Sequence, residues 1–386
     1  MIATLKYNLK NLEVFHVRNK TILSKERVIS VDALRGFDMF WIMGGDMVFK
    51  GIDNVLHNKL SGFLKEQTNH VEWFGFHFYD IIMPLFLFLV GVSMVYSYRK
   101  RLSSTTSDRP LWKHTIKRIA ILWILGMVVQ GNLLSYDVNQ IQFYTNTLQA
   151  IAGGYLIATI FVLYLPVIYQ VAATIGLMLI YWAILALIPI GGSTANAYTP
   201  DGNVAMYVEK IVMGRFIGWG TYTWIVSTLN FGTTVMLGVF SGYMMQSNQN
   251  KMKKFWNYLI FGISMIILAL FWDIWHPIIK HIWTSSFVLF SGGICVLMLA
   301  VFYLLIDVWS LRKGTKWLII LGSNAIFGYV AWHLFAGNFV GMAETLINGL
   351  KPWIGGWFDS LRYFGGFMAL YAILWYMYNN KTFIKI

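Results

Sequence analysis

Residues 284–307 read TSSFVLFSGGICVLMLAVFYLLID, an apolar run with no charged side chain before Asp307. A helix of about 20 apolar residues crosses the ~30 Å hydrocarbon core of a bilayer. Similar runs recur along the 386-residue chain, in which 57% of the residues are hydrophobic and only 12% are charged, against roughly 25% charged residues in soluble proteins. The sequence therefore predicts an all-α fold, a polytopic transmembrane helical bundle.

Ten membrane spans are expected from the apolar runs. Their predicted ranges are 34–50, 76–98, 116–131, 147–165, 167–189, 228–246, 256–272, 284–307, 317–341 and 363–379. The fourth and fifth ranges meet at Leu165-Pro166, which is compatible with a tight turn between two spans or with a kink in one helix.

Composition excludes several other classes of protein. Disorder is incompatible with so many apolar residues, and the single cysteine, Cys295, excludes a disulfide framework. The net charge of +13 does not indicate nucleic-acid binding, because the basic residues lie in short loops between apolar runs. That distribution is typical of membrane topology signals.

The positions of Lys and Arg predict the orientation of the chain. With a cytoplasmic N-terminus, 21 of the 30 basic residues lie inside and 8 outside, as the positive-inside rule requires. Both termini are therefore expected in the cytoplasm. The predicted organisation is a basic cytoplasmic segment at 1–33 with no signal-peptide core, one transmembrane domain at 34–379 and a cytoplasmic tail at 380–386.

Acidic side chains in the first span need an explanation, because an ionised group in hydrocarbon costs at least ~2.5 kcal/mol. Asp32 and Arg35 are three residues apart on one helix face, and we expect them to pair and to have a structural role. Asp46 follows Gly44-Gly45 near the outer end of the span, where a ligand has room to approach.

The most informative segment is NHVEWFGFHFYDIIMPLFLFLVGVS, residues 69–93. It places His70 and Trp73 just before the second span and Asp80 inside it. An isolated interfacial histidine usually has only a structural role. A histidine among acids and an aromatic residue, next to an intramembrane aspartate, is more typical of a general base.

Later spans carry further polar residues that are expected to meet in the outer half of the bundle. These are Gln149, Lys280, Trp283, Ser286, Asn324 and His333. Each one alone is better explained as a hydrogen bond between helices, whereas their convergence suggests a binding site. No metal is expected, since the chain has no HExxH or Cys/His zinc pattern, and GxSxG and P-loop motifs are missing as well.

These residues carry a family resemblance. The runs SVDALRGFDMFWIMGGD (30–46), 69–93, NTLQAIAGGYLIA (146–158), IWTSSFVLFSGG (282–293) and GSNAIFGYVAWH (322–333) resemble, in order, the heparan-alpha-glucosaminide N-acetyltransferase family. The resemblance covers residues 27–379, and its most specific part is the His-x-x-Trp segment that begins at His70.

The resemblance implies a membrane acetyltransferase with a catalytic His70. Acetyl-CoA would enter from the cytosol, and the acetyl group would reach the amine of a glucosamine-type sugar on the other side. Some family members have an asparagine where this chain has Asp46, so this carboxylate is expected either to hold the amine or to act as a base. Asp46 or Asp80 would orient the His70 ring, and Trp283, Ser286 or Asn324 would stabilise the oxyanion.

The phosphates of CoA are expected to meet basic residues in the inner loops, namely Arg99, Arg101, Lys117 and Arg118. The expected partners are acetyl-CoA, an amino-sugar acceptor and the lipid bilayer, with no nucleic acid; a homodimer is left open. The expected location is a bacterial cytoplasmic membrane.

Two alternatives from other classes remain. One is a proton-coupled transporter of amino sugars or small solutes that uses the intramembrane Asp and His residues as a relay. The other is an O-acyltransferase of envelope glycans.

Overall fold

The computed structural model of the protein describes residues 28–102, 109–191, 197–218 and 220–384. Most of the predicted N-terminal segment at 1–33, and the last two residues of the predicted tail, lie outside this part. The structure is 77% helical, and the described residues contain no strand. The all-α prediction is confirmed.

The chain divides into two compact units, each described here by itself. Unit 1 comprises 87–297 among the described residues, and unit 2 comprises the described residues up to Phe86 together with 298–384. The division falls inside two helices, α5 (Ile82–Leu102) and α12 (Ser285–Tyr303).

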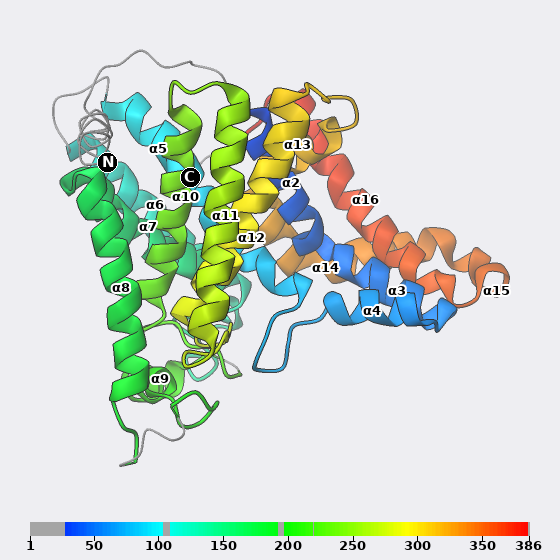
Figure 1. The fold of residues 1–386 in the computed structure, drawn as a ribbon. Coiled ribbons are helices and arrows are strands. Elements are labelled where there is room, and N and C mark those ends of the chain that lie inside the picture. Colours follow the sequence, from blue (N-terminus) through cyan, green and yellow to red (C-terminus); the bar gives the residue numbers. More distant parts are fainter. Residues whose placement is uncertain (1–27, 103–108, 192–196, 219, 385–386) are drawn as a thin grey trace. The chain divides into compact units, whose positions relative to one another are not determined.

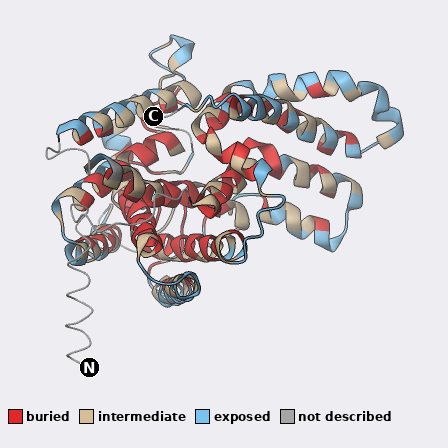
Figure 2. Ribbon diagram, turned by 90° about the horizontal axis from the view of Figure 1, so that it is seen from above, coloured by how far each residue is buried: buried red, intermediate tan, exposed pale blue. Residues whose placement is uncertain are grey.

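Unit 1 is built around α10 (Thr228–Gln246), of whose 19 residues 14 are buried. It packs against α7 (Thr147–Tyr164) and α8 (Val167–Leu187), beside which it lies in Figure 1. The other helices of this unit are α6 (Arg109–Val129), α9 (Val204–Met213) and α11 (Lys251–Asp273). On α11 the buried residues Tyr258, Gly262, Met265 and Ala269 share one side, as expected for a helix packed on one side. Figure 2 shows helices that are buried on one side and exposed on the other.

Unit 2 contains two packed groups of helices. In one, α2 (Ile29–Phe40) lies against α13 (Lys316–Ser323), with Ala33, Ile306 and Leu318 in the core. In the other, α16 (Trp357–Asn379) packs on α14 (Ala325–Ile347) and α3 (Asp46–Leu56). The short helices α4 (Lys59–Gln67) and α15 (Lys351–Ile354) complete the unit.

Every predicted span lies largely in helix, but two of them are interrupted. The first is broken at η2 (Trp41–Gly45), where Gly44 has φ +94°, a conformation that glycine adopts without strain. The ninth is broken at Asn324, between α13 and α14. Apolar periodicity does not reveal these breaks, because they change the backbone without changing the hydropathy.

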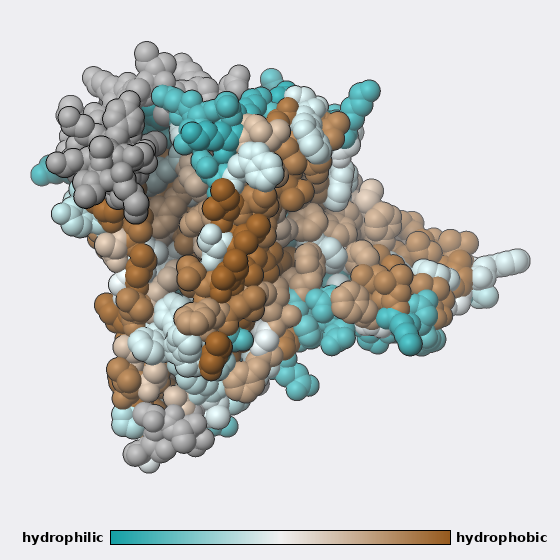
Figure 3. All heavy atoms as spheres, viewed as in Figure 1, coloured by the Kyte–Doolittle hydropathy of each residue, from teal (hydrophilic) through white to brown (hydrophobic). Residues whose placement is uncertain are grey.

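Within the described ranges, six helices are long and apolar enough to cross a membrane. They cover Phe78–Arg99, Thr147–Tyr164, Val167–Leu187, Lys251–Asp273, Ser285–Val308 and Ala325–Ile354. Exposed apolar side chains line α11, among them Trp256, Ile260 and Ile267. Figure 3 shows a hydrophobic surface along this helix. Such a surface is typical of contact with lipid.

The join at Leu165-Pro166 separates two helices. α7 ends at Tyr164, and Pro166, with ψ 152°, stands before the first residue of α8. A proline at this position costs no hydrogen bond, because the first N–H groups of a helix have no partner within it. The predicted ranges 147–165 and 167–189 are therefore two helices.

Candidate active site

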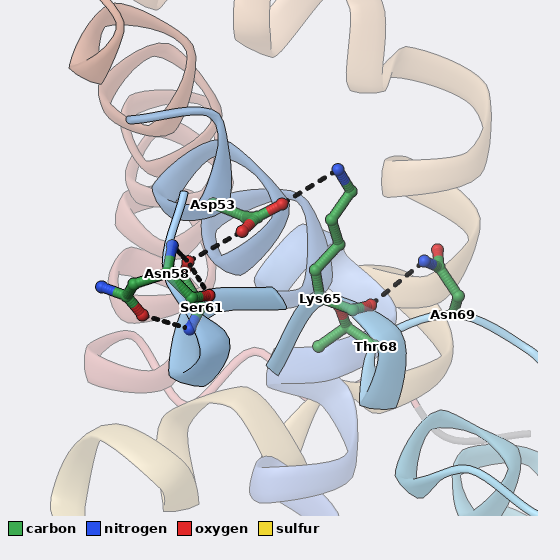
Figure 4. Close-up of polar contacts among 6 residues, drawn as sticks. All are labelled: Asp53, Asn58, Ser61, Lys65, Thr68 and Asn69. Atoms are coloured by element: carbon green, nitrogen blue, oxygen red, sulfur yellow. Dashed lines mark hydrogen bonds and ion pairs between the residues drawn. The ribbon is translucent and has the colours of Figure 1, made fainter. Parts of the chain in front are cut away.

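The candidate site in unit 2 is carried by the loop from α4 to α5, which the hairpin of α3 and α4 holds in place. The Asn58 side chain accepts a hydrogen bond from the Ser61 N–H at 2.9 Å and caps α4. Asp53 on α3 accepts hydrogen bonds from the Ser61 hydroxyl at 2.7 Å and from the Lys65 ammonium at 3.0 Å (Figure 4). These two bonds lower the pKa of Asp53, so this carboxylate is ionised and binds both helices together.

Hydrogen bonds continue from α4 into the loop. The Lys65 carbonyl accepts from the Thr68 hydroxyl and the Asn69 amide, the two residues that precede His70 in sequence. The Gln67 side chain accepts from the Phe78 N–H at 3.0 Å. The two ends of the loop are thus tied to the C-terminal turn of α4.

His70 and Asp80 form a hydrogen-bonded pair across this loop. His70 Nδ1 lies 2.7 Å from Asp80 Oδ1, and 43% of the His70 side chain is exposed while the Asp80 side chain is fully buried. Asp80 Oδ2 accepts from the N–H of His77 at 2.9 Å and of Val71 at 3.3 Å. Because Asp80 accepts at Nδ1, a neutral His70 carries its proton there, and Nε2 is its basic nitrogen.

Asp80 occupies η3 (Phe78–Ile81), ahead of α5. Pro84 therefore stands in the first turn of α5, where it removes no intrahelical hydrogen bond. The loop geometry at Asp80 arises from the hydrogen bonds to its carboxylate, and it does not require a proline kink.

Asp46 binds a different partner, Lys50. Lys50 Nζ lies 2.9 Å from Asp46 Oδ2 and 5.8 Å from the centre of the Tyr79 ring. The Tyr79 ring lies 5.0 Å from the His70 ring. Of the two acids expected to orient His70, the structure thus places Asp80 on the ring. Sequence reasoning missed Lys50 and Tyr79, although the i,i+4 spacing of Asp46 and Lys50 was visible.

The glycines next to Asp46 do not leave open space. A Cβ on Gly44 would lie 2.4 Å from the Trp332 ring, and one on Gly45 would lie 2.7 Å from the Phe40 ring. The room that we expected for a ligand beside Gly44-Gly45 is therefore filled by aromatic side chains, because these glycines serve close packing.

The other predicted site residues of unit 2 have local partners. Arg35 pairs with Asp32 at 3.3 Å, as expected for a structural pair. His333 stacks on Tyr329 with ring centres 4.1 Å apart. The Asn324 amide binds the Thr382 carbonyl and the Ile384 N–H, so it holds the C-terminal segment. Trp73 is buried.

The remaining predicted residues of the acceptor site belong to unit 1, and all are buried. The Gln149 amide binds the backbone of residues 143–146 and caps α7. Trp283 Nε1 donates to the Thr234 hydroxyl at 3.1 Å, and the Ser286 hydroxyl donates to the Pro277 carbonyl at 3.0 Å. Lys280 is only 3% exposed. These bonds give Gln149 and Ser286 structural roles at the starts of α7 and α12.

Two buried ionisable groups of unit 1 had not been assigned a role from the sequence. Burial raises the pKa of Glu209 on α9. Its carboxylate accepts hydrogen bonds from the N–H groups of Ile225 and Trp224, and these bonds oppose the rise. Burial lowers the pKa of His276 to about 3. His276 Nε2 accepts the Ser285 N–H at 2.9 Å, so its Nδ1 proton is donated to the Tyr198 hydroxyl.

Three of the predicted CoA-binding cations share one neighbour, His114. Burial, followed by the charges of Arg101, Arg118 and Lys117, lowers the pKa of His114. The Arg118 guanidinium lies 4.4 Å from the centre of the Tyr155 ring. The fourth cation, Arg99, donates to the Gln246 side chain at 3.1 Å instead. In the described part of the chain, no three His, Cys, Asp or Glu side chains are grouped as metal ligands.

Comparison with known proteins adds one match. Residues 27–201 match the family model described as "Heparan-alpha-glucosaminide N-acetyltransferase, catalytic". No curated protein matches the chain. The matched range contains Asp46, His70 and Asp80 as well as the cations around His114.

Proposed function

Residues 27–201 belong to the heparan-alpha-glucosaminide N-acetyltransferase family, and from this membership we propose that the chain is a membrane acetyltransferase that acetylates an amino sugar. The family uses acetyl-CoA as the acetyl donor. In the proposed reaction, cytosolic acetyl-CoA supplies the acetyl group, and the amine of a glucosamine-type sugar receives it at the outer face.

The observation that carries the proposal is the pair of His70 and Asp80. A protonated sugar amine is not a nucleophile, so a base must remove a proton before or during attack on the thioester. His70 Nε2 is that base, and the buried Asp80 carboxylate stabilises the imidazolium through Nδ1. The amine nitrogen forms the new bond to the acetyl carbon, the C–S bond breaks, and the CoA thiolate takes a proton from the imidazolium. The acetyl group passes either directly or through an acetyl-His70 intermediate, and both routes use Nε2.

The cations around His114 support a site for the donor phosphates. Arg101, Lys117 and Arg118 lie close enough together to act on one imidazole. A polyanionic CoA would offset their mutual repulsion, and guanidinium groups bind phosphate oxygens with paired hydrogen bonds. Because basic loops also face the cytoplasm by the positive-inside rule, this position agrees with a cytosolic donor.

Acetyl transfer in proteoliposomes tests the function. The purified protein is supplied with radiolabelled acetyl-CoA and glucosamine, and N-acetylated sugar is the expected product. His70→Ala should abolish transfer while the protein stays folded by circular dichroism. His57→Asn, which changes an exposed histidine of the same unit, should retain it. Uptake of sugar without acetylation would indicate a transporter, and acetylated hydroxyl groups would indicate an O-acyltransferase; either product, or full activity in His70→Ala, contradicts the proposal.

A further inference from the structure

The ion pair of Asp46 and Lys50 differs from an ordinary pair on a helix surface. Aspartate and lysine four residues apart often pair on exposed helices, where such a pair contributes little. Here the carboxylate is nearly buried, with 7% of the Asp46 side chain exposed against 26% of Lys50. The Lys50 ammonium also lies near the Tyr79 ring, 5.8 Å from its centre. One ammonium group therefore contacts a buried carboxylate and approaches an aromatic ring at the same time.

A carboxylate and an aromatic ring are the two groups with which proteins hold ammonium ligands. The carboxylate supplies a charge-assisted hydrogen bond, and the ring supplies a cation–π contact. Asp46 and Tyr79 together thus form a complete site for a primary ammonium group. In the ligand-free protein the side chain of Lys50 fills it.

This ammonium site lies beside the candidate base. The Tyr79 ring that approaches Lys50 is also 5.0 Å from the His70 ring. Lys50 and His70 are therefore neighbours of the same ring, and both side chains are partly exposed while Asp46 is nearly buried. A sugar whose amine replaced the Lys50 ammonium would have that amine next to the same Tyr79 ring that contacts the His70 imidazole.

We propose that Asp46 and Tyr79 bind the ammonium group of the acceptor, and that Lys50 occupies this site when no acceptor is bound. This inference rests on the proposed function, because that function makes the acceptor an amine. Lysine suits this role because its ammonium is a point charge on a flexible four-carbon stem that can turn towards solvent. Without Lys50, Asp46 would be a nearly buried carboxylate without a cation, which is costly.

The inference assigns separate roles to the two acids near His70. Asp80 orients the imidazole, whereas Asp46 holds the amine and does not take its proton. Lys50 competes with the acceptor and so sets its affinity. The expected ligands are primary amines on a small polar body, and their neutral acetylated products should leave the site because they carry no ammonium group.

Binding of glucosamine in the absence of acetyl-CoA tests the inference without depending on catalysis. Isothermal titration calorimetry on the full chain in detergent compares the wild type with Lys50→Met, which keeps the stem and removes the charge. Lys50→Met should bind glucosamine about fivefold more tightly, because the competing ammonium is gone. Asp46→Asn should weaken binding by about tenfold or more. N-acetylglucosamine, the same sugar without an ammonium group, should respond to neither change.

Lys65→Met is the matched control. Lys65 forms a similar ion pair with Asp53, at 3.0 Å, in the same helical hairpin (Figure 4). The Ser61 hydroxyl still binds Asp53 and Asn58 still caps α4 in this variant, so the hairpin is kept and glucosamine affinity should be unchanged. Lys50→Gln provides a second uncharged variant in case Lys50→Met does not fold, and it should show the same gain.

The outcomes separate the inference from the proposed function. Unchanged or weaker glucosamine binding in both uncharged variants at position 50 would overturn the role of Lys50 as a substitute for the acceptor, even if the wild type acetylates glucosamine. If those variants bind glucosamine more tightly but the wild type transfers no acetyl group, the result would support the ammonium site and contradict the proposed acetyltransferase function.

Discussion

At the scale of single residues, the reactivity of His70 depends on what surrounds its ring. A fully buried Asp80 accepts at Nδ1, and two backbone N–H groups bind the other oxygen of the same carboxylate. A carboxylate held by three hydrogen bonds fixes the orientation of the imidazole. His77, which is a nearby histidine in the same loop, has its Nδ1 on the Asn69 carbonyl instead. The two histidines therefore differ in their partners, although both lie in one short segment.

Replacing Asp80 with asparagine tests this difference. We expect Asp80→Asn to lower kcat by about 10²-fold or more, because an amide can favour the wrong tautomer of His70 and cannot stabilise an imidazolium. The KM for the amino sugar should change little, since Asp80 is buried and the amine is assigned to Asp46. Steady-state kinetics over a pH series would measure both. A large rise in KM with unchanged kcat would contradict the orienting role.

A second prediction at this scale concerns pH and His276. In the unfolded chain this imidazole titrates near its ordinary pKa of 6.5, whereas in the fold burial lowers its pKa to about 3. As the pH falls below 6.5, the unfolded chain takes up a proton that the folded chain cannot bind, so stability present above pH 6.5 is lost progressively towards pH 3. We expect the Tm of the detergent-purified protein to fall between pH 7.5 and pH 5.

The variant His276→Gln tests whether His276 causes this loss. Glutamine can still accept the Ser285 N–H but does not titrate. The variant should have a lower Tm at pH 7.5 and a smaller fall on acidification. Equal slopes for the two proteins would show that other groups cause the acid sensitivity.

At the scale of helices, close packing in unit 1 depends on glycines. A Cβ on Gly238 of α10 would lie 1.9 Å from the Phe88 carbonyl oxygen, and a Cβ on Gly91 of α5 would lie 1.9 Å from the Val235 carbonyl oxygen. The backbones of α5 and α10 therefore touch, as small residues allow in membrane proteins. Because the clashing atoms are backbone, a side-chain rotation cannot relieve them.

Alanine at Gly238 should separate these two helices. We expect Gly238→Ala to destabilise the protein by about 1–3 kcal/mol, as for other overpacked sites, and to lower its Tm in detergent. Gly176→Ala is the matched control, since a Cβ on this helical glycine of α8 meets nothing within 4 Å. The control should keep or raise the Tm because alanine favours helix. A Tm for Gly238→Ala equal to that of the control would contradict the close crossing.

At the scale of the whole molecule, the number of membrane crossings is decisive. The ten predicted spans all lie largely in helix, and among the residues that the structure describes six helices meet the length and hydropathy expected of a span. α10 is not one of these six helices, because it contains the polar residues Asn230, Thr233 and Thr234, which are buried inside unit 1. A helix surrounded by protein needs less apolar surface than one that faces lipid. We therefore propose that the ten-span topology, with both termini in the cytoplasm, is the correct one.

Cysteine labelling distinguishes ten spans from six. The only native cysteine, Cys295, is buried, so the background is low. Ser135 is exposed and lies outside in both topologies, whereas the exposed Asn248 is cytoplasmic with ten spans and external with six. In intact cells, a membrane-impermeant maleimide should label Ser135→Cys but should label Asn248→Cys only after the membrane is opened. Labelling of both in intact cells would exclude ten spans.

The amino-acid sequence by itself determined the class of the fold, the helical ranges and several pairings. Apolar runs and the sites of Lys and Arg are local properties, so 147–165 and 228–246 were predicted within a few residues. The Asp32–Arg35 pair was predictable for the same reason, since i,i+3 neighbours share a helix face. His70 and Asp80 were named from their shared segment and their unusual position at a membrane boundary.

Only the tertiary structure decided which acid contacts the base His70. Asp46 and Asp80 were equally good partners for His70 in the sequence, and the fold of the loop after α4 placed Asp80 on the ring and left Asp46 to Lys50. The breaks at Gly44 and Asn324, and the position of the Tyr79 ring near both Lys50 and His70, likewise depend on packing between segments distant in sequence. Hydropathy records how much a residue avoids water. It does not determine the direction in which a side chain points once the helices have packed, and catalysis depends on that direction.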